Sequence, residues 1–138
     1  MHQFQLDPRL AADTAEIGTL GLCSLLLMKD RRWPWLILVP RRNDISELHD
    51  LTPLDQTTLI FETCMVAKAL KGFTGADKIN VGSLGNMVPM LHVHVIARRN
   101  GDPGWPGPVW GFGKTEAYEE ETLARLREGL AKAVLPDR

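Results

Sequence analysis

The chain has 138 residues, 44% of them hydrophobic and 24% charged, which is the length and composition of a single globular domain. Its formal net charge of −1 gives no general attraction to nucleic-acid polymers or to anionic membranes. No apolar run reaches the roughly 18 residues that a membrane-spanning helix needs, and the N-terminus lacks the pattern of a signal peptide. We therefore expect one cytoplasmic domain over residues 1–138, with neither a membrane nor a nucleic-acid polymer as partner.

The N-terminal part of the chain predicts a short helix followed by a β-hairpin. Asp7 can cap the helix, and Pro8 fits the first helical position. Two apolar segments, residues 22–28 and 35–39, flank a polar turn and predict a pair of antiparallel strands. Pro40 should end the second strand, because proline has no N–H to donate to a neighbouring strand.

The middle and the end of the chain predict two further helices and another strand. A long helix should begin with Thr52 as its N-cap and Pro53 at its first position, and Gly72 is a reasonable residue for its C-terminal end. The segment 78–82 predicts a strand. A final helix should be capped by Thr115. Its apolar stripe would consist of Leu123, Leu126, Leu130 and Val134.

In residues 90–96, the aliphatic residues Leu91, Val93 and Val95 alternate with Met90, His92 and His94. This period of two predicts a half-buried strand. Successive side chains of a strand point to opposite faces, so Met90, His92 and His94 would share one face. The two imidazoles would then lie about 6–7 Å apart along a rigid element. The residues that would face the core are Leu91, Val93, Val95 and Ala97.

From the residues alone, this histidine pair has three interpretations. It could be a solvent-facing pair without a role, part of a metal site, or a pair that performs nucleophilic or acid–base chemistry near neutral pH. A catalytic zinc needs at least about three protein ligands, and none of the other candidate ligands has a suitable spacing to the pair. Those candidates are the carboxylates together with His2, His49, Cys23 and Cys64. We therefore expect no metal and no cofactor.

The segment from Leu91 to Arg98, with the upstream residues 80–86, resembles the signature of the histidine-triad (HIT) superfamily. That signature reads His-φ-His-φ-His-φ-φ, where φ is hydrophobic. The hydrophobic positions place Met90 at the first histidine, His92 at the second and His94 at the third. The resemblance implies an α+β fold in which helices pack on one face of an antiparallel sheet. It also implies a homodimer.

The resemblance further implies chemistry at a nucleotide α-phosphate. The middle histidine, here His92, would attack the phosphorus atom, and the covalent nucleotidyl-imidazole would then be hydrolysed or transferred to another acceptor. His94 would donate a hydrogen bond to a phosphate oxygen. Other residues that we expect at the substrate site are Asn80, Asn86, Met90 and Arg98. The two asparagines could equally serve only as turn residues.

Methionine at position 90 departs from the family pattern, because a thioether cannot form the hydrogen bonds of an imidazole. Three outcomes stay open. A backbone carbonyl could orient His92, the enzyme could prefer leaving groups that need no proton, or the protein could be a catalytically weak nucleotide-binding regulatory module.

The Pro- and Gly-rich segment 103–111 should form a loop whose two tryptophans contact a nucleoside, contact a second subunit or cover the surface.

Overall fold

The computed structural model describes residues 3–135. A short 3-10 helix, Leu48–Asp50, precedes the long helix of the chain. The remaining elements are α1 (Pro8–Asp13), β1 (Thr14–Thr19), β2 (Cys23–Met28), β3 (Trp35–Pro40), α2 (Pro53–Thr74), β4 (Lys78–Gly82), β5 (Val93–Arg98) and α3 (Glu120–Val134).

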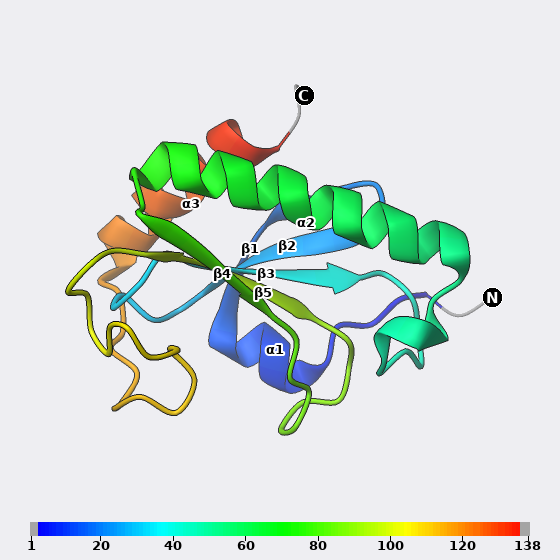
Figure 1. The fold of residues 1–138 in the computed structure, drawn as a ribbon. Helices are drawn as coiled ribbons and strands as arrows, with labels where there is room; N and C mark the ends of the chain where they lie inside the picture. The colour runs from blue at the N-terminus through cyan, green and yellow to red at the C-terminus, as the bar shows by residue number, and fades with distance from the viewer. Residues whose placement is uncertain (1–2, 136–138) are drawn as a thin grey trace.

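The strands form one antiparallel sheet of five strands in the order β1-β2-β3-β5-β4. The long helices α2 and α3 lie across one face of the sheet, and the short helix α1 lies on the opposite side (Figure 1). This arrangement confirms the predicted α+β class with helices against an antiparallel sheet. Strand β5 lies inside the sheet, where Ile37 of β3 and Gly82 of β4 both pair with His94.

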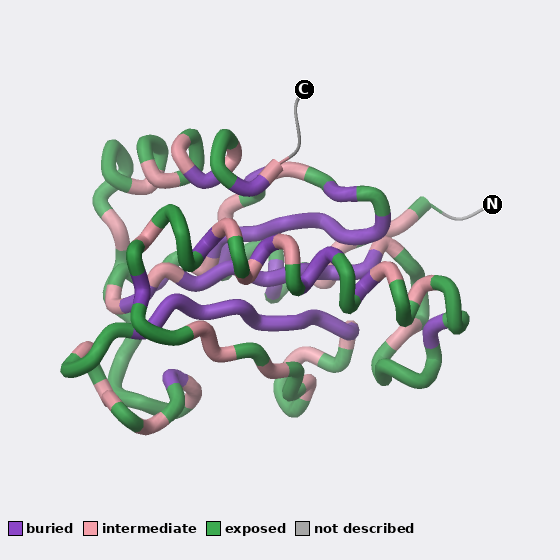
Figure 2. Tube along the Cα trace, turned by 45° about the horizontal axis from the view of Figure 1, so that its top comes forward, coloured by how far each residue is buried: buried purple, intermediate pink, exposed green. Residues whose placement is uncertain are grey.

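Both faces of the sheet are buried. In Figure 2 the central strands are therefore drawn in purple, the colour of buried residues. The face under α2 and α3 carries the larger apolar cluster, and the predicted inward residues Leu91, Val93, Val95 and Ala97 all belong to it. The opposite face carries a smaller cluster around Trp33, Trp35, Ile37, Val39 and Ile96. The alternation in the sequence therefore separates the two faces of the strand as predicted. The face of the histidines, however, was predicted to be the open side of a half-buried strand, and it is buried beside the smaller cluster.

Helix α2 is fixed to the sheet by a buried carboxylate. The two side-chain oxygens of Glu62 accept hydrogen bonds from the backbone N–H groups of Leu22 and Cys23, at 2.9 and 3.0 Å.

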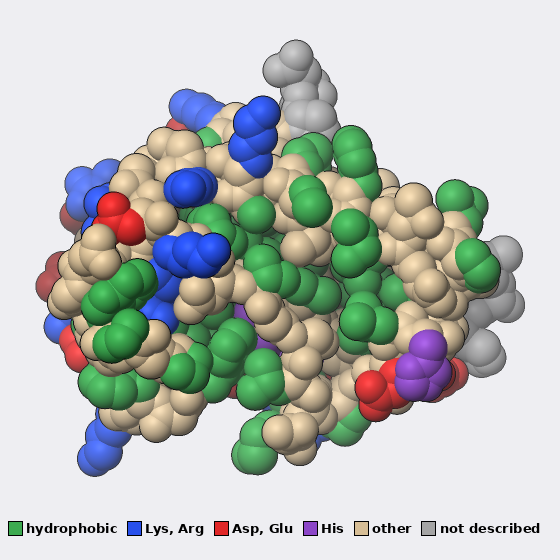
Figure 3. Space-filling view, viewed as in Figure 1, with side chains coloured by type: hydrophobic (Ala, Val, Ile, Leu, Met, Phe, Trp, Pro, Cys, Tyr) green, Lys and Arg blue, Asp and Glu red, His purple; other side chains and the backbone are tan. Residues whose placement is uncertain are grey.

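The outer side of helix α2 exposes large apolar side chains. Figure 3 shows apolar side chains gathered on this face of the molecule. Over residues 3–135, no helix is both long enough and apolar enough to cross a lipid bilayer.

Four predicted features differ from the structure. The half-buried strand predicted over residues 90–96 is observed as β5 over Val93–Arg98, and all of its residues are buried. Strand β1 has no counterpart among the predicted elements. Helix α2 continues past Gly72 and ends at Gly75, whose φ of 69° is left-handed and whose N–H donates to the carbonyl of Lys71. Helix α3 begins at Glu120 rather than near Thr115, because the residues before it form no helix and Glu119 has an extended backbone. That segment is held to the β2–β3 turn by the backbone hydrogen bond from Arg31 to Glu116.

Candidate active site

A cavity of about 560 Å³ opens on the face of the sheet that carries the smaller apolar cluster. Its walls come from the end of α1, the β2–β3 turn, residues 84–88 and residues 109–115. His92 and His94 both contribute to its lining. A volume of this size is typical of a small-molecule or cofactor site.

The two imidazoles are buried and close together. His92 and His94 are 6% and 5% exposed, and their ring centroids lie 4.8 Å apart. His94 sits within β5, and His92 comes directly before that strand, where its carbonyl accepts a hydrogen bond of 2.8 Å from the hydroxyl of Ser83. The sheet therefore holds both rings on a rigid support.

The hydrogen bond of His92 defines its tautomer. Its Nδ1 atom lies 2.6 Å from the carbonyl oxygen of Met90. A carbonyl oxygen only accepts hydrogen bonds, so Nδ1 must carry the proton. In neutral His92 the lone pair is then on Nε2.

His94 has the opposite arrangement. Its Nδ1 accepts a hydrogen bond of 2.9 Å from the indole Nε1–H of Trp35. An indole N–H only donates, so Nδ1 carries the lone pair and Nε2 carries the proton. Burial lowers the pKa of His94 to about 3, and the neighbouring His92 lowers it in the same direction. His94 is therefore a neutral hydrogen-bond donor at physiological pH.

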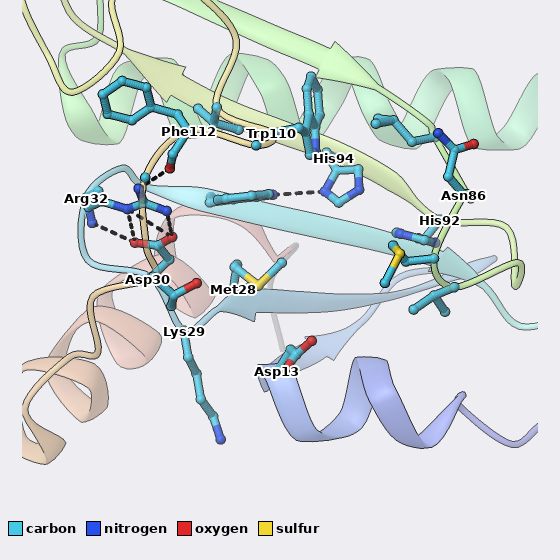
Figure 4. A pocket seen from close by; sticks show the side chains of 18 of the residues that line it. Asp13, Met28, Lys29, Asp30, Arg32, Asn86, His92, His94, Trp110 and Phe112 are labelled. Carbon is cyan, nitrogen blue, oxygen red and sulfur yellow. Dashed lines mark hydrogen bonds and ion pairs between the residues drawn. The ribbon is translucent and has the colours of Figure 1, made fainter.

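Two tryptophans flank the His94 ring. The centroid of Trp35 lies 5.6 Å from that of His94, and the centroid of Trp110 lies 5.3 Å from it. Trp110 rests on the bare backbone of Gly82, where an added Cβ would lie 2.7 Å from its Cη2 atom. Figure 4 shows the two imidazoles and Trp110 gathered at one end of the cavity. The absence of a side chain at Gly82 therefore lets the loop over residues 109–115 approach β4.

The charged side chains that line the cavity are balanced in sign: Asp13, Lys29, Asp30 and Arg32. Arg32 forms a 2.7 Å ion pair with Asp30 and also donates to the carbonyl of Phe112 (Figure 4). Burial raises the pKa of the Asp30 carboxyl, but the hydrogen bonds from Arg32 and from backbone N–H groups outweigh it, so that this pKa is lowered. The cavity consequently has no large excess of positive charge.

A family model described as "HIT domain" matches residues 9–101, well over half of the chain. The chain belongs to the HIT domain family. This confirms the family that residues 80–98 predict.

Solved structures of related proteins have the same fold. A histidine triad protein of Sinorhizobium meliloti 1021 is 62% identical, with a TM-score of 0.92 over 94% of this chain and 96% of that one. A histidine triad protein of Marinobacter aquaeolei VT8 is 47% identical, with a TM-score of 0.93 over 96% of this chain and 97% of that one. A third, from Bradyrhizobium japonicum, is 44% identical, with a TM-score of 0.93 over 96% of this chain and 99% of that one.

A curated relative has a named activity. AP-4-A phosphorylase of Mycobacterium tuberculosis is 36% identical over 73 residues. The matched stretch covers 49% of this chain and 37% of that relative, so this HIT protein matches little more than a third of the relative's length.

The structure brings only some of the predicted site residues of this HIT protein to the cavity. His92, His94 and Asn86 line it. Met90 is half-buried and packs against the smaller apolar cluster, and its carbonyl oxygen contacts His92.

The other two predicted residues, Asn80 and Arg98, bind each other outside the cavity lining. Arg98 is 1% exposed and forms a 2.7 Å ion pair with Asp102. Its guanidinium also donates to the side-chain oxygen of Asn80 at 3.2 Å and to the carbonyl of Gly107 at 2.8 Å. These two residues fasten the loop after β5 to the sheet.

Sequence reasoning did not assign Trp35, Lys29, Asp30 or Arg32 to the site. A signal for Trp35 was present, because the alternation of β3 places it on the same face as Ile37. Over residues 3–135, no group of three or more His, Cys, Asp or Glu side chains could hold a metal ion. His2, one of the candidate ligands in the sequence, lies outside the described residues.

Proposed function

We propose that this HIT protein cleaves a nucleotide or nucleotide conjugate at its α-phosphate through a covalent nucleotidyl-histidine intermediate. The observation that carries the proposal is the pair of opposite tautomers at His92 and His94. One ring offers a lone pair on Nε2 and the other offers an N–H, within 4.8 Å between ring centroids. A phosphoryl group needs both, because it is attacked at phosphorus and gains charge on its oxygens.

The proposed reaction has two displacements. In the first, the lone pair on Nε2 of His92 forms a P–N bond, and the leaving group departs with the electrons of the bond that joined it to phosphorus. In the second, water or another hydroxyl acceptor attacks phosphorus, the P–N electrons return to Nε2, and the attacking oxygen loses its proton to solvent water. The Nε2–H of His94 stabilises the negative charge that develops on a non-bridging oxygen in both steps.

The proposal places Met90 where HIT proteins have their first histidine. Orientation of His92 then depends on the carbonyl oxygen of Met90, at 2.6 Å from Nδ1, and not on a side chain at position 90. This supports the outcome in which a backbone carbonyl orients His92.

The apolar and aromatic walls of the cavity would hold the nucleoside, and the name of the mycobacterial relative, AP-4-A phosphorylase, supports a nucleotide as substrate.

The test compares the wild type with His92→Ala on adenosine 5′-phosphoramidate and on dinucleoside polyphosphates. Loss of the nucleophile should lower turnover by about three orders of magnitude or more. His49→Ala is the matched control, because the His49 side chain is 83% exposed and does not line the cavity. Mass spectrometry of acid-free quenched samples should detect one nucleotidyl group on the wild type and none on His92→Ala. Equal turnover in the wild type and His92→Ala would remove His92 as nucleophile.

A second candidate function is a catalytically weak, nucleotide-binding regulatory module. The balanced charges of the cavity favour it, because Arg32 is already bound to Asp30 and few cations remain to stabilise a transition state. Such a module would be stabilised against heat by AMP, since a ligand that binds only the native state raises its stability. It would show no turnover that depends on His92.

We also propose a homodimer. Strand β4 is an edge strand, and α2 beside it exposes Leu54, Ile60 and Phe61. Val81 in the edge strand is 53% exposed. Unpaired edges and contiguous apolar surface are features of interaction sites, and a second copy of the same face would cover both at once.

A further inference from the structure

Two buried imidazoles share one cavity but have opposite hydrogen-bond partners. His92 meets an obligatory acceptor, the carbonyl of Met90, and His94 meets an obligatory donor, the indole of Trp35. The first contact comes from the backbone of the same segment. The second comes from a side chain on another strand, and Trp35 is 6% exposed, so its indole N–H cannot turn to solvent without moving the core.

We propose that Trp35 is a positioning residue that holds His94 as a neutral hydrogen-bond donor and excludes it from proton transfer. The catalytic consequence of this inference rests on the proposed function, whereas the tautomer of His94 does not. Protonation of His94 at Nδ1 would put two N–H groups against each other at 2.9 Å and would bury a positive charge.

Within residues 3–135, the surroundings of His94 add no group that would favour its charged form. The ring contacts are His92, Trp35 and Trp110, none of which carries a negative charge. The carboxylates that line the same cavity are Asp13, which is exposed, and Asp30, which is paired with Arg32. Burial and the neighbouring His92 lower the pKa of His94. The bond from Trp35 acts in the same direction, because only the neutral form of Nδ1 can accept it.

A histidine held in this way stabilises charge but moves no proton. As an acid, His94 would have to give up its only N–H proton and become an imidazolate anion. As a base, it would need the Nδ1 lone pair that Trp35 already occupies. The leaving group must therefore depart with its electron pair and take its proton from water. The site should favour weakly basic leaving groups, such as the phosphate or carboxylate of a nucleotidyl conjugate, over alkoxides.

The first test uses the wild type alone and needs no turnover. Nitrogen-15 NMR of the imidazoles should give the Nε2–H tautomer for His94 and the Nδ1–H tautomer for His92. The His94 signals should not titrate between about pH 8 and pH 5, the range in which an ordinary histidine changes charge. An Nδ1–H tautomer for His94, or a titration within this range, would overturn the inference even if no variant folds.

The second test compares Trp35→Phe with Trp33→Phe. Trp33 packs against Trp35 with a centroid distance of 6.0 Å, but its indole N–H donates to the carbonyl of Pro103, so it is the matched control. In Trp35→Phe the Nδ1 atom of His94 loses its donor, so the His94 signals should show a mixture of the two neutral tautomers and a pKa above that of the wild type, although burial still lowers it. The kcat should fall about 10-fold while KM changes little. That loss is smaller than the roughly 10²- to 10³-fold expected when a transition-state donor is deleted outright.

The dependence of kcat on the leaving group shows, in the same two variants, whether Trp35 positions His94 or only supports the fold. In the wild type, kcat should depend steeply on the basicity of the leaving group in a series of conjugates with one nucleoside. In Trp35→Phe this dependence should become shallower at acidic pH, because a protonated His94 can then donate a proton. Trp33→Phe should resemble the wild type in its pH profile and in this dependence.

The two proposals fail in different ways. If His92→Ala retains turnover while His94 has the predicted tautomer, the proposed function fails and the role of Trp35 in fixing the tautomer stands. If His92→Ala is inactive but Trp35→Phe leaves both the tautomer and the pKa of His94 as in the wild type, the inference about Trp35 fails and the proposed function stands.

Discussion

At the scale of single residues, Met90 contributes a backbone carbonyl to His92 while its side chain packs in the smaller apolar cluster. We therefore expect Met90→Leu to keep kcat/KM within about threefold of the wild type, because the carbonyl remains and a Leu-for-Met exchange conserves volume, which usually costs less than about 1.5 kcal/mol. Steady-state kinetics and urea unfolding measure the two effects. A large loss of activity at unchanged stability would show that the thioether itself takes part.

His94 links the pH to the stability of the fold. The unfolded chain binds a proton at this histidine below its ordinary pKa of 6.5, whereas the folded chain does not until its pKa of about 3. Stability should therefore fall as the pH is lowered from 6.5 towards 3, because the unfolded state takes up the proton first.

The measurement is the free energy of unfolding by urea as a function of pH, for the wild type and for His94→Gln. Glutamine does not titrate, so the variant should lose less stability over the same acidic interval. Parallel curves for the two proteins would show that His94 is protonated as readily in the folded as in the unfolded chain.

The sequence predicts some of these residues better than others, for a physical reason. The shared face of His92 and His94 follows from the period of two in a strand, which needs no knowledge of the rest of the fold. Asn80 and Arg98 are different, because their partners Asp102 and Gly107 lie on an irregular loop. No periodicity predicts the course of that loop, so the pattern could not show that Arg98 would be fully paired.

At the scale of elements, Gly82 controls how closely the loop over residues 109–115 approaches β4. In Gly82→Ala the new Cβ would lie 2.7 Å from the Trp110 ring, so the ring must shift, and overpacking of this kind typically costs about 1–3 kcal/mol. Because Trp110 contacts His94, we expect kcat/KM to fall about 10-fold as well. Urea unfolding and steady-state kinetics measure these changes.

Gly72→Ala is the control for that substitution. A Cβ at Gly72 meets nothing within 4 Å, and the residue lies inside α2, where alanine is favoured over glycine by roughly 0.5–1 kcal/mol. This variant should be at least as stable as the wild type and fully active. If Gly82→Ala behaved in the same way, the close approach of Trp110 would have no role in the site.

Element boundaries were predictable where a local signal decided them. Asp7 and Thr52 cap α1 and α2 as predicted, because their side chains accept from nearby backbone N–H groups. Strand β1 was missed because its sequence contains Gly18, next to a register irregularity between Glu16 and Gly18. The start of α3 was missed because Glu116, in the segment before it, is hydrogen-bonded to the distant β2–β3 turn, and local sequence does not encode that contact.

At the scale of the whole molecule, the proposed homodimer predicts a concentration-dependent mass. Light scattering after size-exclusion chromatography should give about twice the chain mass of 15.4 kDa for the wild type. Val81→Lys should shift it towards the monomer, because a lysine on an edge strand opposes pairing and a two-fold interface contains the substitution twice.

Thr122→Lys adds the same charge at an exposed position of α3 and should leave the mass unchanged. A monomeric wild type, or a dimer that both variants preserve, would contradict an interface at β4. Activity of each variant at concentrations above and below the transition would show whether the cavity works within a single chain.

The opposite proton placement on the two imidazoles also makes the protein selective towards covalent reagents. An electrophile that enters the cavity needs a nitrogen with an uncommitted electron pair. His92 has one on Nε2, whereas the only pair on His94 is bound to the indole of Trp35. Two histidines that look alike in the sequence therefore offer a single point of attachment, and an acylating or phosphorylating probe placed there would form one adduct and leave the second ring unmodified.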